Sequence, residues 1–347
     1  MKIAVDAMGG DYAPEAIVDG AVQAARVARG RYEIILVGDE QKIRRELSRY
    51  AADKLPISIY HASQAIGMEE SPMQALRSKR DASVLVATQL AKKGMADAVV
   101  SAGNTGAFMA AALLTLGRLP KVSRPALGSF IPNEKGISVV IDVGANVDSK
   151  PANLLQFGVM GSIYMEHIFD ISRPKVGLLN IGEEESKGPE VIRQAYQLLQ
   201  HSSLNFIGNV EGRDILRGTA EVVVCDGFVG NIVLKFAESI IGMLTRTLKK
   251  KVGKNIPANL GALLMKPTFR KLRQLMDYQE YGGVPLLGVN GVCIVCHGRS
   301  TPKAIRNAIR EARKMIELEV NERLEEAIAD NIVLEERENW AIKRHSR

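Results

Sequence analysis

Short runs of apolar residues, many of them β-branched, alternate along the chain with longer segments in which apolar residues recur at helical spacing. The short runs predict strands at residues 3–5, 34–37, 57–60, 98–100, 139–141, 176–179 and 222–225. The longer segments predict helices that include residues 14–29, 72–93, 152–169 and 189–199, and a last long helix with Thr301 as N-cap and Pro302 at its first position. This rhythm is typical of an α/β protein whose mostly parallel sheet lies between two layers of helices, a three-layer Rossmann-like fold.

Five of the predicted strands end in a polar residue that is followed by a turn containing glycine. The polar residues are Asp6, Ser101, Asp142, Asn180 and Asp226. In open parallel sheets, ligands bind outside the carboxyl ends of the strands, so we expect these turns to gather at one site. Glycine turns and helix N-termini present backbone N–H groups to anions, which makes phosphate the expected ligand. The alternative is that Gly and Asp only form ordinary turns, which explains two or three such ends more readily than five.

Residues in and beside these turns make up the predicted phosphate and substrate site. They are Asp6, Gly9, Gly10, Asn104, Thr105, Gly106, Asp142, Asn146, Asn180, Asp226 and Gly227. The sequence lacks G-x-G-x-x-G, G-x-x-x-x-G-K-[ST], H-E-x-x-H and G-x-S-x-G. Dinucleotide, P-loop, zinc-protease and nucleophile-elbow interpretations therefore lose their usual support, and we expect neither a cofactor nor a metal.

Lys187 and His297 are two further candidates for this site. Lys187 follows the acidic residues 183–185 between a strand and a helix, where it would bring a mobile positive charge to phosphate oxygens; a solvated lysine is the alternative. The three acids point in different directions, which disfavours a metal site. His297 ends a strand as the five polar residues do, so it is a candidate for the same site, with a structural histidine as the alternative.

Cysteine usage argues against metal, haem and disulfide chemistry. Cys293, Cys296 and His297 match the C-x-x-C-H pattern of haem attachment, but their flanks indicate a buried strand, so we interpret both cysteines as core residues. With Cys225 the count is three, which is too few for a disulfide framework and fits a reducing compartment.

The N-terminal segment has no apolar run long enough for a signal peptide before its first acid, Asp6. The sequence also has no run of about 18 uninterrupted apolar residues. We therefore expect a cytoplasmic protein without a membrane-spanning helix.

The net charge of +7 is concentrated in one segment. Residues 239–276 contain nine basic residues and no acid, which leaves the rest of the chain at −2. A nearly neutral body with one basic segment indicates a localised anionic partner and not a nucleic acid.

This basic segment lies within residues 228–281, which we interpret as an amphipathic helical hairpin. Its first arm has apolar residues at helical spacing, and its tip at residues 256–265 is apolar. The residues predicted to contact an anionic membrane or a partner are Lys249, Lys250, Lys251, Leu260, Leu263, Leu264 and Lys266. The alternative is that the apolar stripe packs against a second copy of the chain while the lysines are solvated; both arrangements can hold together.

Six short segments at the ends of predicted strands, taken in order along the chain, resemble the bacterial phosphate acyltransferase family. This family makes acyl phosphate from acyl-carrier protein and inorganic phosphate for phospholipid synthesis. The segments are VDAMGGD at 5–11, SAGNTGA at 101–107, DVGANVD at 142–148, NIGEE at 180–184, CDGFVGN at 225–231 and HGRS at 297–300. The resemblance implies a fold akin to isocitrate and isopropylmalate dehydrogenases and phosphate acetyltransferases. It also implies a homodimer, peripheral association with the inner face of the cell membrane, and a downstream glycerol-phosphate acyltransferase in that membrane. It places Lys187 and Asn231 near the reacting groups.

The predicted residues suit this chemistry. Inorganic phosphate is already a nucleophile near neutral pH, so the enzyme needs positioning and a cationic cradle more than a strong base. We expect Asn231 or backbone N–H groups to hold the oxyanion and Lys187 to offset phosphate charge, with His297 as a further catalytic candidate. Asn104, Thr105 and Asn146 would position the phosphate oxygens.

Residues 1–331 are expected to form a two-lobed catalytic unit with a soft internal boundary, with residues 228–281 inserted within it and residues 332–347 as a tail. Three alternative functions are compatible with the sequence. The first is a phosphate acetyl- or butyryltransferase that uses acyl-CoA, the second is a metal- and NAD-dependent dehydrogenase of the same fold, and the third is a membrane-bound scaffold without activity.

Overall fold

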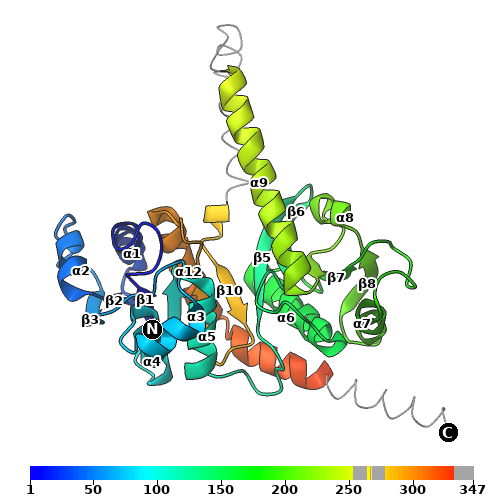
Figure 1. Ribbon diagram of the computed structural model, residues 1–347, viewed down its shortest axis with the longest axis horizontal. Helices are drawn as coiled ribbons and strands as arrows, with labels where there is room; N and C mark the ends of the chain where they lie inside the picture. Colours follow the sequence, from blue (N-terminus) through cyan, green and yellow to red (C-terminus); the bar gives the residue numbers. More distant parts are fainter. Residues whose placement is uncertain (253–263, 266, 268–277, 332–347) are drawn as a thin grey trace.

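One large sheet runs through the molecule. The computed structural model describes residues 1–252, 264–265, 267 and 278–331 (Figure 1). In this part of the chain eleven strands lie in the order β3-β2-β1-β4-β11-β10-β5-β6-β9-β7-β8. Their bounds are β1 Lys2–Asp6, β2 Glu33–Gly38, β3 Ile57–His61, β4 Ala98–Ser101, β5 Ala126–Asn133, β6 Gly136–Ile141, β7 Lys175–Leu179, β8 Asn205–Val210, β9 Val222–Val224, β10 Val284–Leu287 and β11 Val292–Val295. All seven strands predicted at stated residue ranges from the sequence are present.

Helices connect most of the strands. They are α1 Glu15–Ala28, α2 Glu40–Leu47, α3 Pro72–Ser78, α4 Ser83–Lys92, α5 Thr105–Thr115, α6 Pro151–Phe169, α7 Glu190–Gln200, α8 Gly212–Arg217, α9 Gly227–Val252 and α12 Pro302–Glu317, with a 3₁₀ turn η1 at Tyr278–Glu280. The single helix predicted over residues 72–93 is wrong, because α3 and α4 are separate. Between them Asp81 accepts hydrogen bonds from Ser63, and Ala82 forms a bridge with Gln64, so a tertiary contact interrupts the helical pattern.

The two halves of the sheet run in opposite directions. Strands β1, β2, β3, β4 and β11 are parallel to one another, as are β6, β7, β8 and β9. Between these halves, β10 is antiparallel to both β11 and β5, and β5 is antiparallel to β6. The expectation that all polar strand ends meet at one edge is therefore wrong: the carboxyl ends of β1, β4 and β11 lie at one edge, and those of β6, β7 and β9 at the other.

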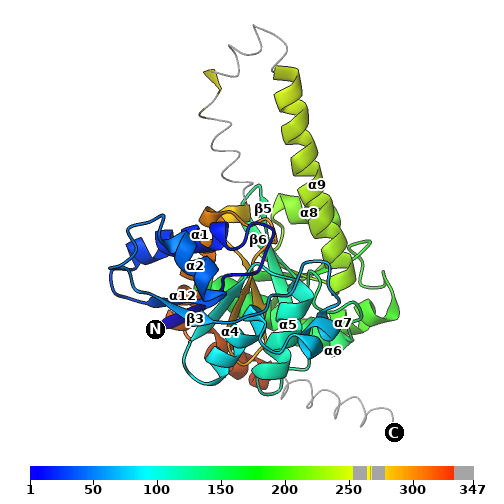
Figure 2. The same cartoon turned by 60° about the vertical axis from the view of Figure 1, so that its left-hand side comes forward.

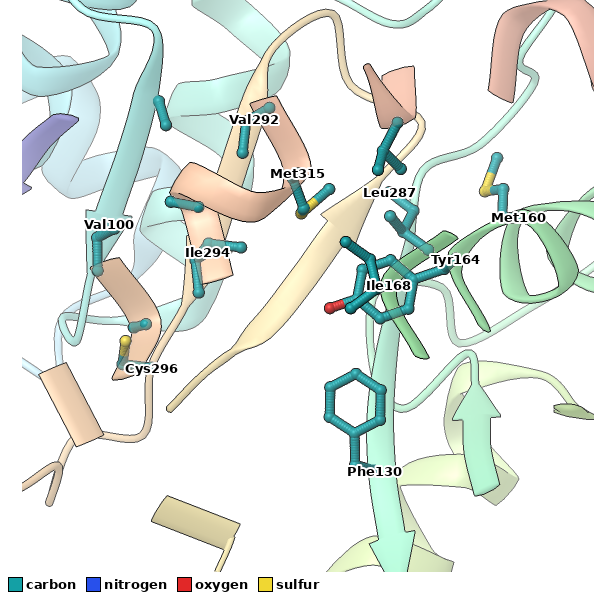
Figure 3. Packing of buried hydrophobic residues seen from close by; sticks show 14 of the residues in the cluster. Val100, Phe130, Met160, Tyr164, Ile168, Leu287, Val292, Ile294, Cys296 and Met315 are labelled. Atoms are coloured by element: carbon teal, nitrogen blue, oxygen red, sulfur yellow. The ribbon is translucent and has the colours of Figure 1, made fainter. Parts of the chain in front are cut away.

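Two hydrophobic clusters, one on each face of the sheet, hold the three layers together. The first lies between the sheet and helices α1, α6, α7 and α12, and the second between the sheet and α3, α4, α5, α8 and the base of α9. Figure 3 shows the first cluster, in which Tyr164 of α6 stacks on Phe130 of β5 with 5.6 Å between ring centroids. Burial of these apolar residues is the main force that holds the helices on the sheet.

Helix α9 extends well beyond the body of the molecule (Figures 1 and 2). It confirms the first arm of the predicted hairpin, and its large apolar side chains Phe228, Ile232, Phe236, Met243 and Leu244 are exposed. By length and composition alone, the window Gly227–Leu244 is apolar enough to cross a membrane, and 11% of it is buried.

The remaining predicted contact residues of the hairpin are only partly described. Lys250 is exposed on α9, and Leu264 is 77% exposed. Lys249 and Lys251 belong to the same helix. Leu260, Leu263, Lys266 and the tail at 332–347 lie outside the described residues.

Candidate functional site

Two groups of residues follow from the two sheet edges. We call the loops after β1, β4 and β11 the first edge cluster, and the loops after β6, β9 and β7 the second edge cluster. In the first, the buried carboxylate of Asp6 accepts hydrogen bonds from the Ser101 hydroxyl at 2.7 Å and the Met8 N–H at 3.2 Å. Burial raises the pKa of Asp6, while the hydrogen bonds oppose this shift.

Gly9 brings the loop after β1 onto the loop after β4. A side chain at this position would place its Cβ 2.5 Å from Asp6 Oδ2 and 2.7 Å from the backbone nitrogen of Gly103. Only glycine allows the two loops to approach this closely. The Gly103 N–H in turn donates to the Ser101 hydroxyl at 3.1 Å, so Asp6 and Ser101 fix both loops.

Asn104 caps α5 and is occupied by its own chain. Its side-chain oxygen accepts from the Ala107 N–H at 3.0 Å, and its Nδ2 donates to the carbonyl oxygens of Met68 at 2.9 Å and Glu70 at 3.0 Å. The Asn104 side chain therefore fixes the 67–70 loop, and its predicted role in positioning phosphate stays a prediction. Thr105 and Gly106, the first two residues of α5, remain candidates, because their N–H groups precede the first intrahelical acceptor and the first turn carries no acid.

His297 joins the first edge cluster, as its place at a strand end predicts. It is exposed after β11, and its Nδ1 accepts the N–H of Arg299 at 3.0 Å. The next residue, Gly298, receives the Asp11 N–H on its carbonyl oxygen at 2.7 Å. This contact ties the His297 turn to the loop of Gly9 and Gly10, so the structure brings these three candidates together.

Asp142 organises the second edge cluster. Its fully buried carboxylate accepts five hydrogen bonds: from the N–H groups of Leu127, Gly144 and Ala145 on Oδ1, and from the N–H and Nδ2 of Asn146 on Oδ2. Burial raises the pKa of Asp142, and these bonds counteract the shift. Asn146 Nδ2 also donates to the Pro125 carbonyl at 2.7 Å. Both side chains therefore hold the loop, and their predicted role as phosphate contacts stays a prediction.

The N-terminus of α9 packs directly on this loop. Asp226 accepts the Val229 N–H at 2.8 Å as the cap of the helix, and the Gly227 N–H donates to the Asn146 carbonyl at 2.8 Å. A Cβ at Gly230 would lie 1.9 Å from the carbonyl oxygen of Asp142. This close approach fixes Asn231, whose half-buried side chain lies beside Gly144.

Lys187 lies in the loop after β7, next to β9 in the sheet. Asn180 Nδ2 donates to the Lys187 carbonyl at 3.1 Å, and the exposed lysine side chain folds over Gly182. The predicted divergence of the acids is confirmed: Glu183 lies 3.3 Å from Arg213, whereas Glu185 accepts from Gln197. Lys187, Asn180 and Asn231 thus belong to one edge of the sheet.

Two kinds of residue that hold these loops in place could not be identified from the sequence. Ser101 was noted as a strand end, but its role as the link between Asp6 and Gly103 needs tertiary contacts. Leu127 and Pro125 contribute backbone groups from β5 and its start, a strand the sequence analysis did not predict. The cysteines are core residues as expected, since burial raises the pKa of Cys293 and Cys296 to about 12 and keeps both thiols protonated.

Comparisons with known proteins agree with this architecture. Residues 1–323 match the family described as fatty acid synthesis protein. The chain is 54% identical over 317 residues to a phosphate acyltransferase of Pelotomaculum thermopropionicum, covering 91% of this chain and 92% of that one. It is 49% identical to a phosphate acyltransferase of Desulforamulus reducens over 97% of this chain and all of that protein.

Solved structures show the same fold at low sequence identity. A phosphotransacetylase from Streptococcus pyogenes matches with a TM-score of 0.61 at 22% identity, over 91% of this chain and 94% of that chain. A 4-hydroxythreonine-4-phosphate dehydrogenase from Klebsiella pneumoniae matches with a TM-score of 0.52 at 14% identity, over 90% and 98% of the two chains. The predicted relation to transacylase and dehydrogenase folds is confirmed. With nearly the whole chain matched and about half of its residues identical in these relatives, the protein belongs to the phosphate acyltransferases of the fatty acid synthesis protein family.

Proposed function

We propose that the acyl donor is a long-chain acyl-carrier protein and that the products are acyl phosphate and free carrier. A phosphate oxygen attacks the thioester carbonyl, the C–S bond breaks, and the carrier's thiol leaves with the electron pair. The observation that supports acyl transfer to phosphate is that Lys187, in the loop after β7, and Asn231, near the start of α9 after β9, follow neighbouring strands at one sheet edge. A cation for phosphate charge and an amide for the oxyanion are the two groups that this reaction needs.

We propose further that the two edge clusters form two walls of one substrate site. Four strand-to-strand steps separate β4 from β6, and a twist of roughly 20–25° per step turns the two edges nearly perpendicular. The start of α5 and the base of α9 also border the same hydrophobic cluster, through Phe108 and Val233. In this arrangement Thr105, Gly106 and His297 face the ligand from the first edge, and Lys187 and Asn231 from the second.

The activity is tested with purified protein, long-chain acyl-carrier protein and inorganic phosphate, without nucleotide or metal. Trapping with hydroxylamine should give acyl hydroxamate only when both protein and phosphate are present. Acyl-CoA in place of the carrier tests the alternative donor, and a faster reaction with acyl-CoA would overturn the proposed donor. Lack of any phosphate-dependent product would favour the non-enzymatic scaffold.

Removing either proposed catalytic side chain should slow the reaction. Because one oxyanion-type donor is typically worth about 10²-fold, Lys187→Ala and Asn231→Ala should each lower kcat/KM by roughly that factor. Lys92→Ala, on the exposed surface of α4, is the matched control and should behave like the wild type. Wild-type rates in both site variants would show that these roles are assigned to the wrong residues. His297→Ala, compared by activity and melting temperature, separates a catalytic from a structural histidine.

We also propose that α9 serves assembly and membrane attachment. The exposed apolar stripe on its arm, which includes Ile232 and Phe236, suits a second copy of the chain in a homodimer. The basic and apolar tip suits the anionic inner face of the cell membrane, where a membrane glycerol-phosphate acyltransferase would receive the acyl phosphate. Flotation with anionic liposomes tests this: changing Leu260, Leu263 and Leu264 to Ser should abolish binding, which should weaken with salt in the wild type. If the triple variant floats like the wild type, the tip is not the anchor.

A further inference from the structure

A cavity of about 290 Å³ lies between helices α1 and α12, away from both edge clusters. Its lining residues are Val27, Ala28, Arg31, Tyr32, Arg306, Asn307, Arg310 and Arg313. Four of these eight residues are arginines, and Tyr32 and Asn307 are buried. The cavity is therefore a concave site with a rigid floor and a strongly basic rim.

The fold aims the four guanidinium groups at the same space. Arg306, Arg310 and Arg313 follow one another at spacings of four and three residues, which places them on one face of α12. Arg31 comes from the turn after α1. The two helices approach closely because Gly20 of α1 packs on Ile305, where a Cβ would lie 2.6 Å from the Ile305 Cβ. Tight helix packing thus brings Arg31 to the arginine face of α12.

The positive charge of the cavity is only partly balanced within the described part of the chain, where Glu311 on the same helix interacts electrostatically with Arg310. Arg313 pairs with Glu317 at 3.0 Å. Arg306 donates only a long bond of 3.4 Å to Asn307 Oδ1, and Arg310 one of 3.4 Å to the carbonyl oxygen of Glu280. The Glu280 carboxylate itself is taken by Lys303 at 2.5 Å. Like charges one helical turn apart slightly destabilise a helix, and an anion bound in the cavity would relieve this repulsion.

We propose that this cavity binds a small soluble polyanion that carries phosphate groups. Guanidinium groups bind phosphate oxygens in pairs, and four of them match a ligand with two phosphates better than a single ion. The concave shape and small volume suit a small molecule, whereas a docking surface for an acidic protein would be broader and flatter. The site is independent of the proposed reaction, because none of its residues belongs to either edge cluster.

Calorimetric titration with pyrophosphate tests the proposal on the full-length protein. Wild-type protein should bind it, and Arg306→Ala and Arg310→Ala should each weaken binding roughly tenfold or more, since a charge-assisted hydrogen bond is lost. Arg45→Ala, an exposed arginine on α2 outside the cavity, is the matched control and should bind like the wild type. Arg310→Lys keeps the charge but loses the planar fork, so it should give an intermediate affinity. Equal melting temperatures of the variants would exclude misfolding as the cause.

Repeating the titration with Lys187→Ala separates this cavity from the proposed catalytic site, because binding in the cavity should persist in that variant. If the arginine variants bind pyrophosphate like the wild type, the proposal is wrong. It is also wrong if they keep pyrophosphate affinity and instead raise KM for acyl-carrier protein, which would make this face a protein-docking surface. Loss of flotation on anionic liposomes without loss of pyrophosphate binding would reject a soluble ligand in favour of lipid headgroups.

Discussion

Asp6 and Asp142 end their strands in similar sequence contexts, an apolar strand followed by an acid and a glycine turn, yet the structure uses them differently. The carboxylate of Asp142 accepts five hydrogen bonds that tie together the loop after β6 and the start of β5. Asp6 instead accepts from the hydroxyl of Ser101, which itself holds Gly103. Asp142 thus holds its loop and the start of β5 through five donors, whereas Asp6 accepts the Met8 N–H of its own loop and reaches the loop after β4 through the Ser101 hydroxyl.

This difference teaches that a polar strand end is not by itself a ligand contact. The partners of Asp142 include a residue 15 positions away in the chain, and the partner of Asp6 is 95 positions away. The Asp142 carboxylate is occupied by four backbone N–H groups and the Asn146 amide, so its hydrogen bonds serve the loop. Asn231, in contrast, lies beside Gly144 and follows Gly230, which packs on the Asp142 carbonyl oxygen, so its position depends on this loop.

The largest expected effect comes from replacing each acid by its amide. Asp142→Asn keeps one acceptor oxygen but turns an NH₂ group toward N–H donors, so we expect a loss of roughly 3 kcal/mol or more in the free energy of unfolding. Asp6→Asn disturbs fewer donors and should lose about 1 kcal/mol. Urea unfolding of both variants measures this difference. Equal losses would contradict the comparison.

A second experiment tests how tightly the loop of Asp142 holds α9. Gly230→Ala places a Cβ against the Asp142 carbonyl oxygen, so the helix must shift, at a cost of about 2 kcal/mol or more, and kcat/KM should fall because Asn231 moves with it. Gly242→Ala, farther along the same helix, meets only the flexible end of Arg246 and should stabilise by about 0.5–1 kcal/mol. A harmless Gly230→Ala would mean that the base of α9 is not fixed by this contact.

The smallest expected effect is on the pH dependence of stability. Burial raises the pKa of Asp6 in the folded protein above its ordinary value of 3.8, so its favourable contribution is complete below that value and is lost as pH rises through the folded pKa. The stability deficit of Asp6→Asn relative to wild type should therefore shrink from about pH 4 to pH 7. Unfolding free energies measured across this range provide the test.

Asp39 is the control with the opposite sign. The Lys42 N–H at the start of α2 lowers the pKa of Asp39, so its contribution is present above 3.8 and is lost as pH falls through the folded pKa. The deficit of Asp39→Asn should therefore stay nearly constant between pH 5 and pH 7 and shrink as the pH falls below about 4, whereas that of Asp6→Asn shrinks as the pH rises. Parallel pH profiles of the two variants would contradict the assigned cause.

Local sequence patterns predicted much of the fold. Apolar runs located β1, β2, β3, β4, β6, β7 and β9 because a buried strand needs consecutive apolar residues whatever its neighbours are. They did not reveal that β5 and β10 reverse direction at the centre of the sheet. Strand direction depends on pairing between segments far apart in the chain, and no local pattern records it.

The sequence by itself determined the α/β class, the polar strand ends, the concentration of charge around α9 and the motifs shared with phosphate acyltransferases. The tertiary structure decided that these strand ends occupy two edges, that Asn104, Asp142 and Asn146 support loops, and that α1 and α12 bring four arginines around one cavity. The physical reason is the range of the interactions. Apolar periodicity and turn chemistry act between neighbours along the chain, whereas hydrogen-bond saturation and charge crowding arise only when distant segments pack together.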